Sequence, residues 1–352
     1  MKTLLLSALL IFSFGCSSTS THDRVPNSGP TTTELADHDQ WADLIHFTNT
    51  LTLKDSDITL SPSAGGTSVY AILKQNGKSI GALLPENSAT VLSGEILSFN
   101  LARAFGVAQL YQPGFFRSID GDDLKIFERF VKDMKIKTKA KEENRKMVLK
   151  DIASHPAGIK MVFKQFGTKP QDYEDLVNPD KNIMNAKHTF SGSQNTVLSM
   201  LSCKGPQPNP NIIVKANGGS TTEYTAIFQL STILLIDALT QQWDRFSGGN
   251  LQTVTENGIV KFISFDNGGT WGGLNATKKS LSYVTRFDKR MAEDILALNA
   301  TLNTGKADFY GLSSNTLLHA LGIEKFPEAL PQLKRSLALV AKHIEANPNC
   351  YF

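Results

Sequence analysis

Residues 241–273 read QQWDRFSGGNLQTVTENGIVKFISFDNGGTWGG. The Asn257-Gly258 pair separates two runs rich in apolar and β-branched residues, which predicts a tight β-hairpin. This hairpin is expected to bring Asp244, Asn250 and Asp266 to one end of a small sheet. Phosphoryl transfer needs a carboxylate that orients the nucleophile, and it needs amide and carboxylate oxygens as ligands for Mg²⁺. The stretch therefore indicates a phosphotransferase site.

Two motifs in this stretch, Asp244-Arg245 and Asp266-Asn267-Gly268, resemble the catalytic and metal-binding segments of the atypical protein-kinase-like superfamily. The similar branches are the phosphoinositide kinases, HipA-like kinases, actin-fragmin kinase and the secretory-pathway (Golgi casein kinase) family. The resemblance implies that Asp244 is catalytic and that Asn250 and Asp266 bind Mg²⁺ or Mn²⁺ together with ATP. One alternative stays open, in which Asp244 caps a helix or turn and residues 266–269 form an ordinary tight turn.

The composition is that of a globular protein. A chain of 352 residues allows one large or two ordinary domains, and 41% hydrophobic with 20% charged residues can form a sizeable core. The net charge of +3 is too small to indicate nucleic-acid binding. The seven histidines are scattered and form no HExxH pattern, and no CxxC pair occurs, so a dedicated zinc site is not expected.

The N-terminus has the features of an export signal. Lys2 precedes an apolar run over residues 4–14, which is too short to span a bilayer as a mature helix. Gly15-Cys16 resembles a bacterial lipobox, although Ser13 occupies the position where Leu is usual. We therefore expect a signal peptide over residues 1–15 and lipidation, including palmitate, at Cys16; an ordinary signal peptide cut nearby is the alternative. Ser17 after the lipidated residue favours the outer membrane of the bacterial cell envelope, facing the periplasm or the surface.

Residues 16–35 are rich in Ser, Thr and Pro and are expected to form a flexible tether to a domain over residues 36–352. With Cys16 lipidated, Cys203 and Cys350 remain. Two cysteines in an exported protein suggest one disulfide, which would tie the C-terminus to the middle of the chain. Two separate free thiols are the alternative.

The N-terminal part, about 50–110, reads as strand, Gly-rich loop, strand, turn and strand, followed by a helix over residues 93–105. The kinase resemblance places Gly65 and Gly66 over the phosphates of a nucleotide and pairs Glu95, in the helix, with a lysine of the preceding strand. Leu84 stands where that lysine is expected. Glu95 can alternatively be a favourable charge in the first turn of its helix.

The remaining segments complete a predicted two-lobed, kinase-like α+β fold with a small β-rich N-lobe and a mainly helical C-lobe. We expect an insertion over about 111–210, a hinge over about 211–220 and a C-lobe over about 221–352 that begins with a buried helix. Residues 120–150 are expected to be helical. Five lysines there form a solvated face or, as a second interpretation, contact anionic lipid or an acidic substrate: Lys132, Lys135, Lys137, Lys139 and Lys141.

Three functions remain in view. The first is an exported, lipid-anchored, ATP-dependent phosphotransferase whose acceptor is a protein, a lipid or a small molecule. The second is a pseudokinase that acts as a binding or scaffold lipoprotein, which Leu84 favours. The third is an unrelated lipoprotein scaffold. A lysine or arginine that points at the cleft beside Glu95 would distinguish the first from the second.

Overall fold

The computed structural model describes residues 46–63, 67–166, 171–172, 176–178, 181–247, 249–306 and 309–352. Several predicted features lie outside these ranges. They are the signal peptide, the lipidation site Cys16, the tether, and the phosphate-loop glycines Gly65 and Gly66. These features stay predictions.

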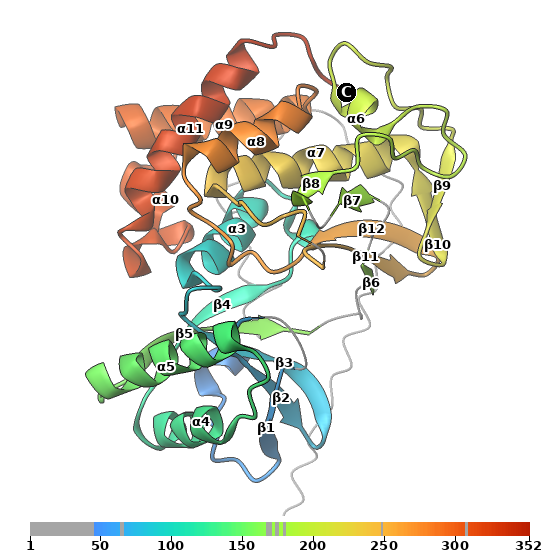
Figure 1. The fold of residues 1–352 in the computed structure, drawn as a ribbon. Helices are drawn as coiled ribbons and strands as arrows, with labels where there is room; N and C mark the ends of the chain where they lie inside the picture. Colours follow the sequence, from blue (N-terminus) through green and yellow to red (C-terminus); the bar gives the residue numbers. More distant parts are fainter. Residues whose placement is uncertain are drawn as a thin grey trace, which may run out of the picture.

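The N-terminal lobe is built on a five-stranded antiparallel sheet, drawn in the lower half of Figure 1. The strands follow the order β1-β2-β3-β5-β4. Their bounds are β1 (Ile58–Pro62), β2 (Ala71–Gln75), β3 (Lys78–Pro85), β4 (Gly114–Ile119) and β5 (Ile159–Gln165). Asn76 and Gly77 form the predicted turn between β2 and β3 with φ of +51° and +77°, the left-handed region that Asn and Gly tolerate best.

The predicted insertion over residues 111–210 is wrong in its first half. Strands β4 and β5 complete the first sheet, and β5 pairs with β3 from Gly81↔Gln165 to Pro85↔Met161. The N-terminal lobe therefore extends to Gln165. The two paired strands are far apart in the sequence, so no local pattern reveals that they are neighbours.

Helices cover both faces of this sheet, because successive side chains along each strand point to opposite faces. Two helices lie on one face, where Phe127 and Val148 pack with Leu83 and Phe163. They are α4 (Gly121–Asp133) and α5 (Lys139–Ser154), so the helical stretch predicted over 120–150 is broken in the middle. On the other face, α3 (Leu92–Ala104) packs Leu92 and Ile96 against β3 and β5.

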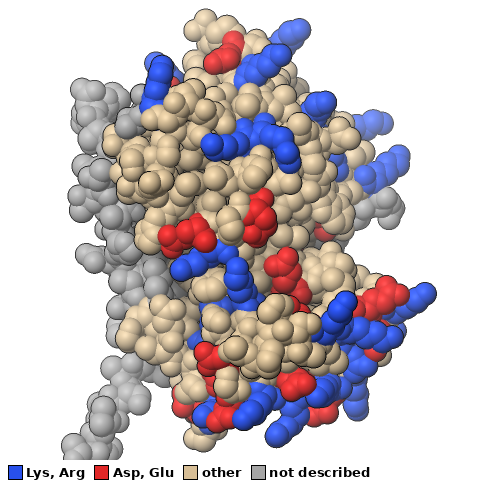
Figure 2. Space-filling view, turned by 90° about the vertical axis from the view of Figure 1, so that its left-hand side faces the viewer, with Lys and Arg blue, Asp and Glu red and all other residues tan. Residues whose placement is uncertain are grey.

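The lysines of α4, α5 and their connection differ in their surroundings. Lys132 is exposed and pairs with Glu128 on the same helix at 2.6 Å. Lys141, by contrast, is buried, and its ammonium donates to the Ser63 hydroxyl at 2.7 Å. The prediction that Lys141 belongs to a solvated face is therefore wrong. In Figure 2, Lys and Arg side chains alternate with Asp and Glu over this lobe, and the face in view has no broad area of one sign.

A second sheet stands at the side of the upper lobe in Figure 1, in the order β6-β11-β12-β10-β9. Its strands are β6 (Gln171–Asp172), β9 (Ile213–Ala216), β10 (Gly219–Thr222), β11 (Leu251–Glu256) and β12 (Ile259–Ser264). The hairpin predicted around Asn257-Gly258 is confirmed: β11 and β12 pair from Leu251↔Ser264 to Glu256↔Ile259.

The predicted hinge at residues 211–220 is wrong. These residues form the β9–β10 hairpin at the far edge of the second sheet, and Ile213 is exposed rather than buried. The first sheet includes β5, which ends at Gln165, and the next strand along the chain, β6, which begins at Gln171, belongs to the second sheet. The run Asn211 to Lys215 has the composition of a buried strand, so its composition does not indicate that it lies at a sheet edge.

The upper lobe is mainly helical, as predicted, and is organised around α7 (Glu223–Thr240). Thr222 caps this helix by accepting from Thr225 N, and Gln241 ends it in the left-handed conformation. Among the described residues, none of the helices combines the length and apolar character needed to cross a bilayer. The other elements of the lobe are η1 (Ala108–Leu110), β7 (Val177–Asn178), β8 (Ile183–Met184), α6 (Val197–Leu201), α8 (Leu274–Tyr283), α9 (Lys289–Thr304), α10 (Ser314–Ala320), η4 (Ile323–Lys325) and α11 (Ala329–Glu345).

The predicted disulfide between Cys203 and Cys350 is confirmed, with the two Cα atoms 5.2 Å apart. Phe287 adds to the attachment of the C-terminus, because its backbone N–H donates to the Cys350 carbonyl. The segment that follows α11 is thereby tied to the segment that follows α6.

Candidate active site

The turn that carries Asp244 lies directly beside the loop that follows Asp266. Trp243 N donates to the Gly269 carbonyl at 2.9 Å, and Gly272 N donates to the Gln241 carbonyl at 3.0 Å. The approach is so close that a Cβ on Gly269 would lie 2.8 Å from the Cβ of Asp244. Glycine is therefore required at position 269, and the two predicted motifs form one structural unit.

Asp244 and Asn250 are in contact, as the hairpin predicted. The Asn250 amide donates to the Asp244 backbone carbonyl at 2.9 Å and to its carboxylate at 3.3 Å. Burial raises the pKa of the Asp244 carboxyl, and the negative charge of Asp266 raises it further. Asp244 is thus a partly buried acid held by an amide, in an environment that favours proton binding.

Asp266 lies at the open end of the hairpin, immediately after β12. Its φ of +47° is in the left-handed region, which Asp adopts more readily than most residues. Its backbone carbonyl accepts from the Gln242 side chain at 3.2 Å, and the same side chain accepts from Asp244 N at 3.1 Å. Gln242 therefore couples the positions of the two aspartates.

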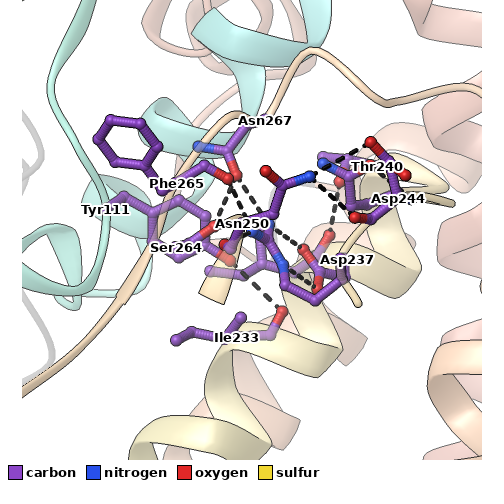
Figure 3. A network of polar contacts seen from close by, with 12 residues as sticks. Tyr111, Ile233, Asp237, Thr240, Asp244, Asn250, Ser264, Phe265 and Asn267 are labelled. Carbon is purple, nitrogen blue, oxygen red and sulfur yellow. Dashed lines mark hydrogen bonds and ion pairs between the residues drawn. The ribbon is translucent and has the colours of Figure 1, made fainter. Parts of the chain in front are cut away.

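Arg245 lies in the network of polar contacts that includes Asp237, Asn250 and Asn267, which are labelled in Figure 3. Its guanidinium forms a two-pronged ion pair with Asp237 of α7, with both N–O distances at 2.8 Å. It also donates to the carbonyls of Asn250 and Phe265 and to the Asn267 side chain. Both partners of the ion pair are almost completely buried. In the sequence, Arg245 stood out only as the neighbour of Asp244, and Asp237 had no assigned role.

The lysine that the sequence analysis did not find is Lys164. Its ammonium lies 2.7 Å from the Glu95 carboxylate, and the two side chains are 6% and 0% exposed. Burial raises the pKa of Glu95, the charge of Lys164 opposes this, and the charge of Asp266 adds to it. The same carboxylate accepts from Asn267 N at 3.2 Å. Glu95 therefore joins the lysine to the loop that carries Asp266.

Leu84 takes no part in this arrangement. It is buried with Ile96 and Val162 in the small cluster between α3 and the sheet. The lysine comes instead from β5, where Lys164 lies opposite Ala82 of β3. Because the alternation along both strands places Ala82, Leu84, Val162 and Lys164 on one face, the ammonium reaches α3 from the neighbouring strand. The only sequence signal for this role is a lysine within the apolar run IKMVFKQ over residues 159–165.

Within the residues that the structure describes, two buried polar atoms beside the two aspartates lack a protein partner. Glu95 Oε1 and Asn267 Nδ2 are buried and have no hydrogen-bond partner among the described protein groups. In the described part of the chain, no cluster of three or more His, Cys, Asp or Glu side chains could hold a metal alone. A metal here would depend on one carboxylate, one amide and oxygens of a ligand, a donor set that Mg²⁺ and Mn²⁺ accept.

The comparisons with known proteins agree with the fold. No family model matches the sequence, and no curated protein matches it. The crystal structure of the Golgi casein kinase is similar, with a TM-score of 0.53, 15% identity, and coverage of 93% of this chain and 81% of that chain. The structure of hydra Fam20 with sugar has a TM-score of 0.49 at 15% identity, with coverage of 89% and 97%. The similarity to the Golgi casein kinase structure, together with the two lobes described above, shows that this chain has a two-lobed, atypical-kinase-like α+β fold.

Proposed function

We propose that the protein is a phosphotransferase that uses ATP with Mg²⁺ or Mn²⁺. The observation that carries this proposal is the 2.7 Å ion pair between Lys164 and Glu95. A buried lysine paired with a carboxylate has its ammonium fixed in position, where it can hold phosphate oxygens. The cost of taking two charges out of water can exceed the attraction between them, so stability alone is a weak reason for this buried pair.

Each of the other polar residues has a place in this chemistry. Asn250 and Asp266 would hold the metal, which when bound neutralises charge that develops on the transferred phosphoryl group. Asp244 accepts the proton of the acceptor hydroxyl and orients its oxygen. The raised pKa of Asp244, caused first by burial, suits a group that takes up a proton.

The pseudokinase alternative rested on Leu84. Lys164 supplies the cation that position 84 lacks, which favours the active enzyme. The unrelated-scaffold alternative requires the three polar side chains to be scattered. Against it, Asn250 contacts Asp244, and the charge of Asp266 acts on Asp244.

We further propose that the enzyme is exported and lipid-anchored through Cys16, in the bacterial cell envelope. The Cys203–Cys350 disulfide supports this, because disulfides persist in oxidising compartments. Glycines 65 and 66 would cover the phosphates, and the acceptor would be a protein, a lipid or a small molecule that carries a hydroxyl group.

Thermal unfolding of the protein with ATP and Mn²⁺ tests the nucleotide site. A ligand at about 100 times its Kd stabilises a protein by about 2.7 kcal/mol, which corresponds to a rise of a few degrees in Tm for a chain of this size. Asp266→Ala should abolish the metal-dependent part of the rise. Asp133→Ala, which removes an exposed carboxylate at the end of α4, should leave it unchanged.

Transfer of the γ-phosphoryl group from ATP then tests the catalytic assignment. We expect slow ATP hydrolysis with water as acceptor in the wild type, and its loss in Asp244→Asn with nucleotide binding retained. Undiminished binding in Asp266→Ala would refute the site, whereas binding without any hydrolysis would return the pseudokinase interpretation.

A further inference from the structure

The side chain of Asn182, which immediately precedes β8, forms hydrogen bonds to both ends of the turn that carries Asp244. The Asn182 amide donates to the Trp243 carbonyl at 2.7 Å and accepts from Phe246 N at 2.9 Å. These two backbone groups flank Asp244 and Arg245. A primary amide carries both a donor and an acceptor, so Asn182 satisfies both ends of the turn and fixes the distance between them.

Asn182 is itself fixed by α8. The ammonium of Lys279 donates to the Asn182 backbone carbonyl, and Lys279 lies within electrostatic range of Asp244. Asn182 has a φ of +48°, a left-handed conformation that Asn adopts readily. Lys279 therefore positions Asn182, and Asn182 in turn positions the turn that carries Asp244.

The inner side of the same turn is held separately. Arg245 is anchored to Asp237 of α7, and the Phe246 ring is buried against Tyr283 with the ring centroids 5.3 Å apart. The turn that carries Asp244 is thus anchored through Arg245 and Phe246 on one side and through the Asn182 amide on the other. Without Asn182, two backbone groups would need water or a changed turn to satisfy them.

We propose that Asn182 and Lys279 are positioning residues for Asp244, and that together they set the orientation of its carboxylate toward the acceptor. This inference rests on the proposed phosphotransferase function. It assigns a role to Asn182, directly before β8, which lies outside both kinase-like motifs.

Hydrogen exchange of residues 243–247 tests the contact without any need for activity. Asn182→Ala and Lys279→Met should each speed exchange of these amides by about tenfold. Lys278→Met, the exposed neighbour on α8, and Asn275→Ala, an exposed amide on the same helix, should not change it. Unchanged exchange in Asn182→Ala would overturn the proposal whether or not the protein is an enzyme.

Kinetics separate positioning from a merely structural effect. We expect the Kd of Mn²⁺–ATP to change by no more than about twofold in Asn182→Ala and Lys279→Met, while turnover falls at least tenfold. Lys279→Arg, which can still donate to the Asn182 carbonyl, should restore most of the turnover.

Faster exchange with normal turnover would also overturn the proposal. A wild-type protein that neither binds Mn²⁺–ATP nor turns it over would refute the proposed function and, with it, the positioning role. The exchange measurement would then report only whether Asn182 holds the turn.

Discussion

Ala82 of β3 and Lys164 of β5 are cross-strand partners, and their side chains share the face of the sheet that packs on α3. The methyl group of Ala82 leaves room at the position from which a longer side chain would reach Glu95. Lys164 uses this room, and its ammonium forms the ion pair with Glu95. The cation of the site is therefore supplied by the strand next to the one on which the sequence resemblance places it.

Replacing Lys164 by Met should remove nucleotide binding. The substitution keeps the volume of the side chain but leaves Glu95 buried without its cation, and breaking a buried ion pair costs about 3–5 kcal/mol. We expect both a lower Tm and loss of the further rise that Mn²⁺–ATP gives.

Lys160→Met is the matched control, because Lys160 lies on the same strand but donates to the Lys325 carbonyl far from Glu95. It should bind Mn²⁺–ATP normally. If Lys164→Met folds and still binds nucleotide with wild-type affinity, Lys164 does not hold the phosphates.

Arg245→Met should destabilise the whole site. Arg245 and Asp237 are 3% and 2% exposed, so the loss of the guanidinium leaves the buried Asp237 carboxylate without its cation and removes one donor from the Phe265 carbonyl. The expected loss in the free energy of unfolding is about 3–5 kcal/mol, measured by urea denaturation.

Arg245→Lys gives a graded comparison. It keeps the charge but cannot reproduce the two-pronged pairing, so its stability should fall between those of the wild type and Arg245→Met. If either variant at position 245 were as stable as the wild type, the hydrogen bonds and ion pair of Arg245 would not stabilise the fold as we expect.

The sequence revealed the features of this site that local chemistry determines. The Asn257-Gly258 turn fixes the register of the β11–β12 hairpin, and that register places Asn250 and Asp266 at one end of it. These features depend on neighbours within a few residues. The overall two-lobed fold was predicted correctly on the same basis, through the motifs around Asp244 and Asp266.

Features that depend on pairing between distant segments could not be read in this way. Lys164 acquires its role because β5 lies beside β3, and Asn182 acquires its contacts because its segment folds onto the Asp244 turn. Neither arrangement leaves a periodic pattern in the sequence. The hinge was misplaced for a related reason, since an apolar run such as Ile212 to Val214 has the same composition at a sheet edge as at a crossing between lobes.

Asp294, on α9 and away from the site, gives a pH-dependent prediction about stability. Burial raises the pKa of its carboxyl above 3.8, and the charges of Asp288 and Glu293 add to this, while Tyr310 and Arg290 oppose it. Because the folded-state pKa is above the unfolded one, folding favours the protonated acid. The contribution of Asp294 to the free energy of unfolding is therefore fully present below about pH 4 and is lost as the pH rises through the folded-state pKa.

Asp294→Asn should consequently be more stable than the wild type at neutral pH, because the amide imitates the protonated acid. The difference should shrink as the pH falls toward 4, as measured by urea denaturation at several pH values. Mn²⁺–ATP binding should be unchanged. A variant less stable than the wild type at neutral pH would mean that the pairing with Arg290 outweighs the cost of burial.

The double variant Ala82→Lys/Lys164→Ala moves the cation from β5 to β3 and tests whether its position, rather than its strand of origin, matters. The two positions are direct cross-strand partners, and cross-strand Cβ atoms lie about 5 Å apart, a distance that a flexible lysine can span. The net charge and the approximate volume of the cluster are preserved.

We expect Lys164→Ala alone to lose Mn²⁺–ATP binding and the double variant to regain part of it, measured as the nucleotide-dependent rise in Tm. Ala82→Lys alone should be destabilised, because it places a second ammonium beside Lys164 with one carboxylate to share. A double variant that folds but binds no nucleotide would show that the approach of the ammonium from β5 is itself required.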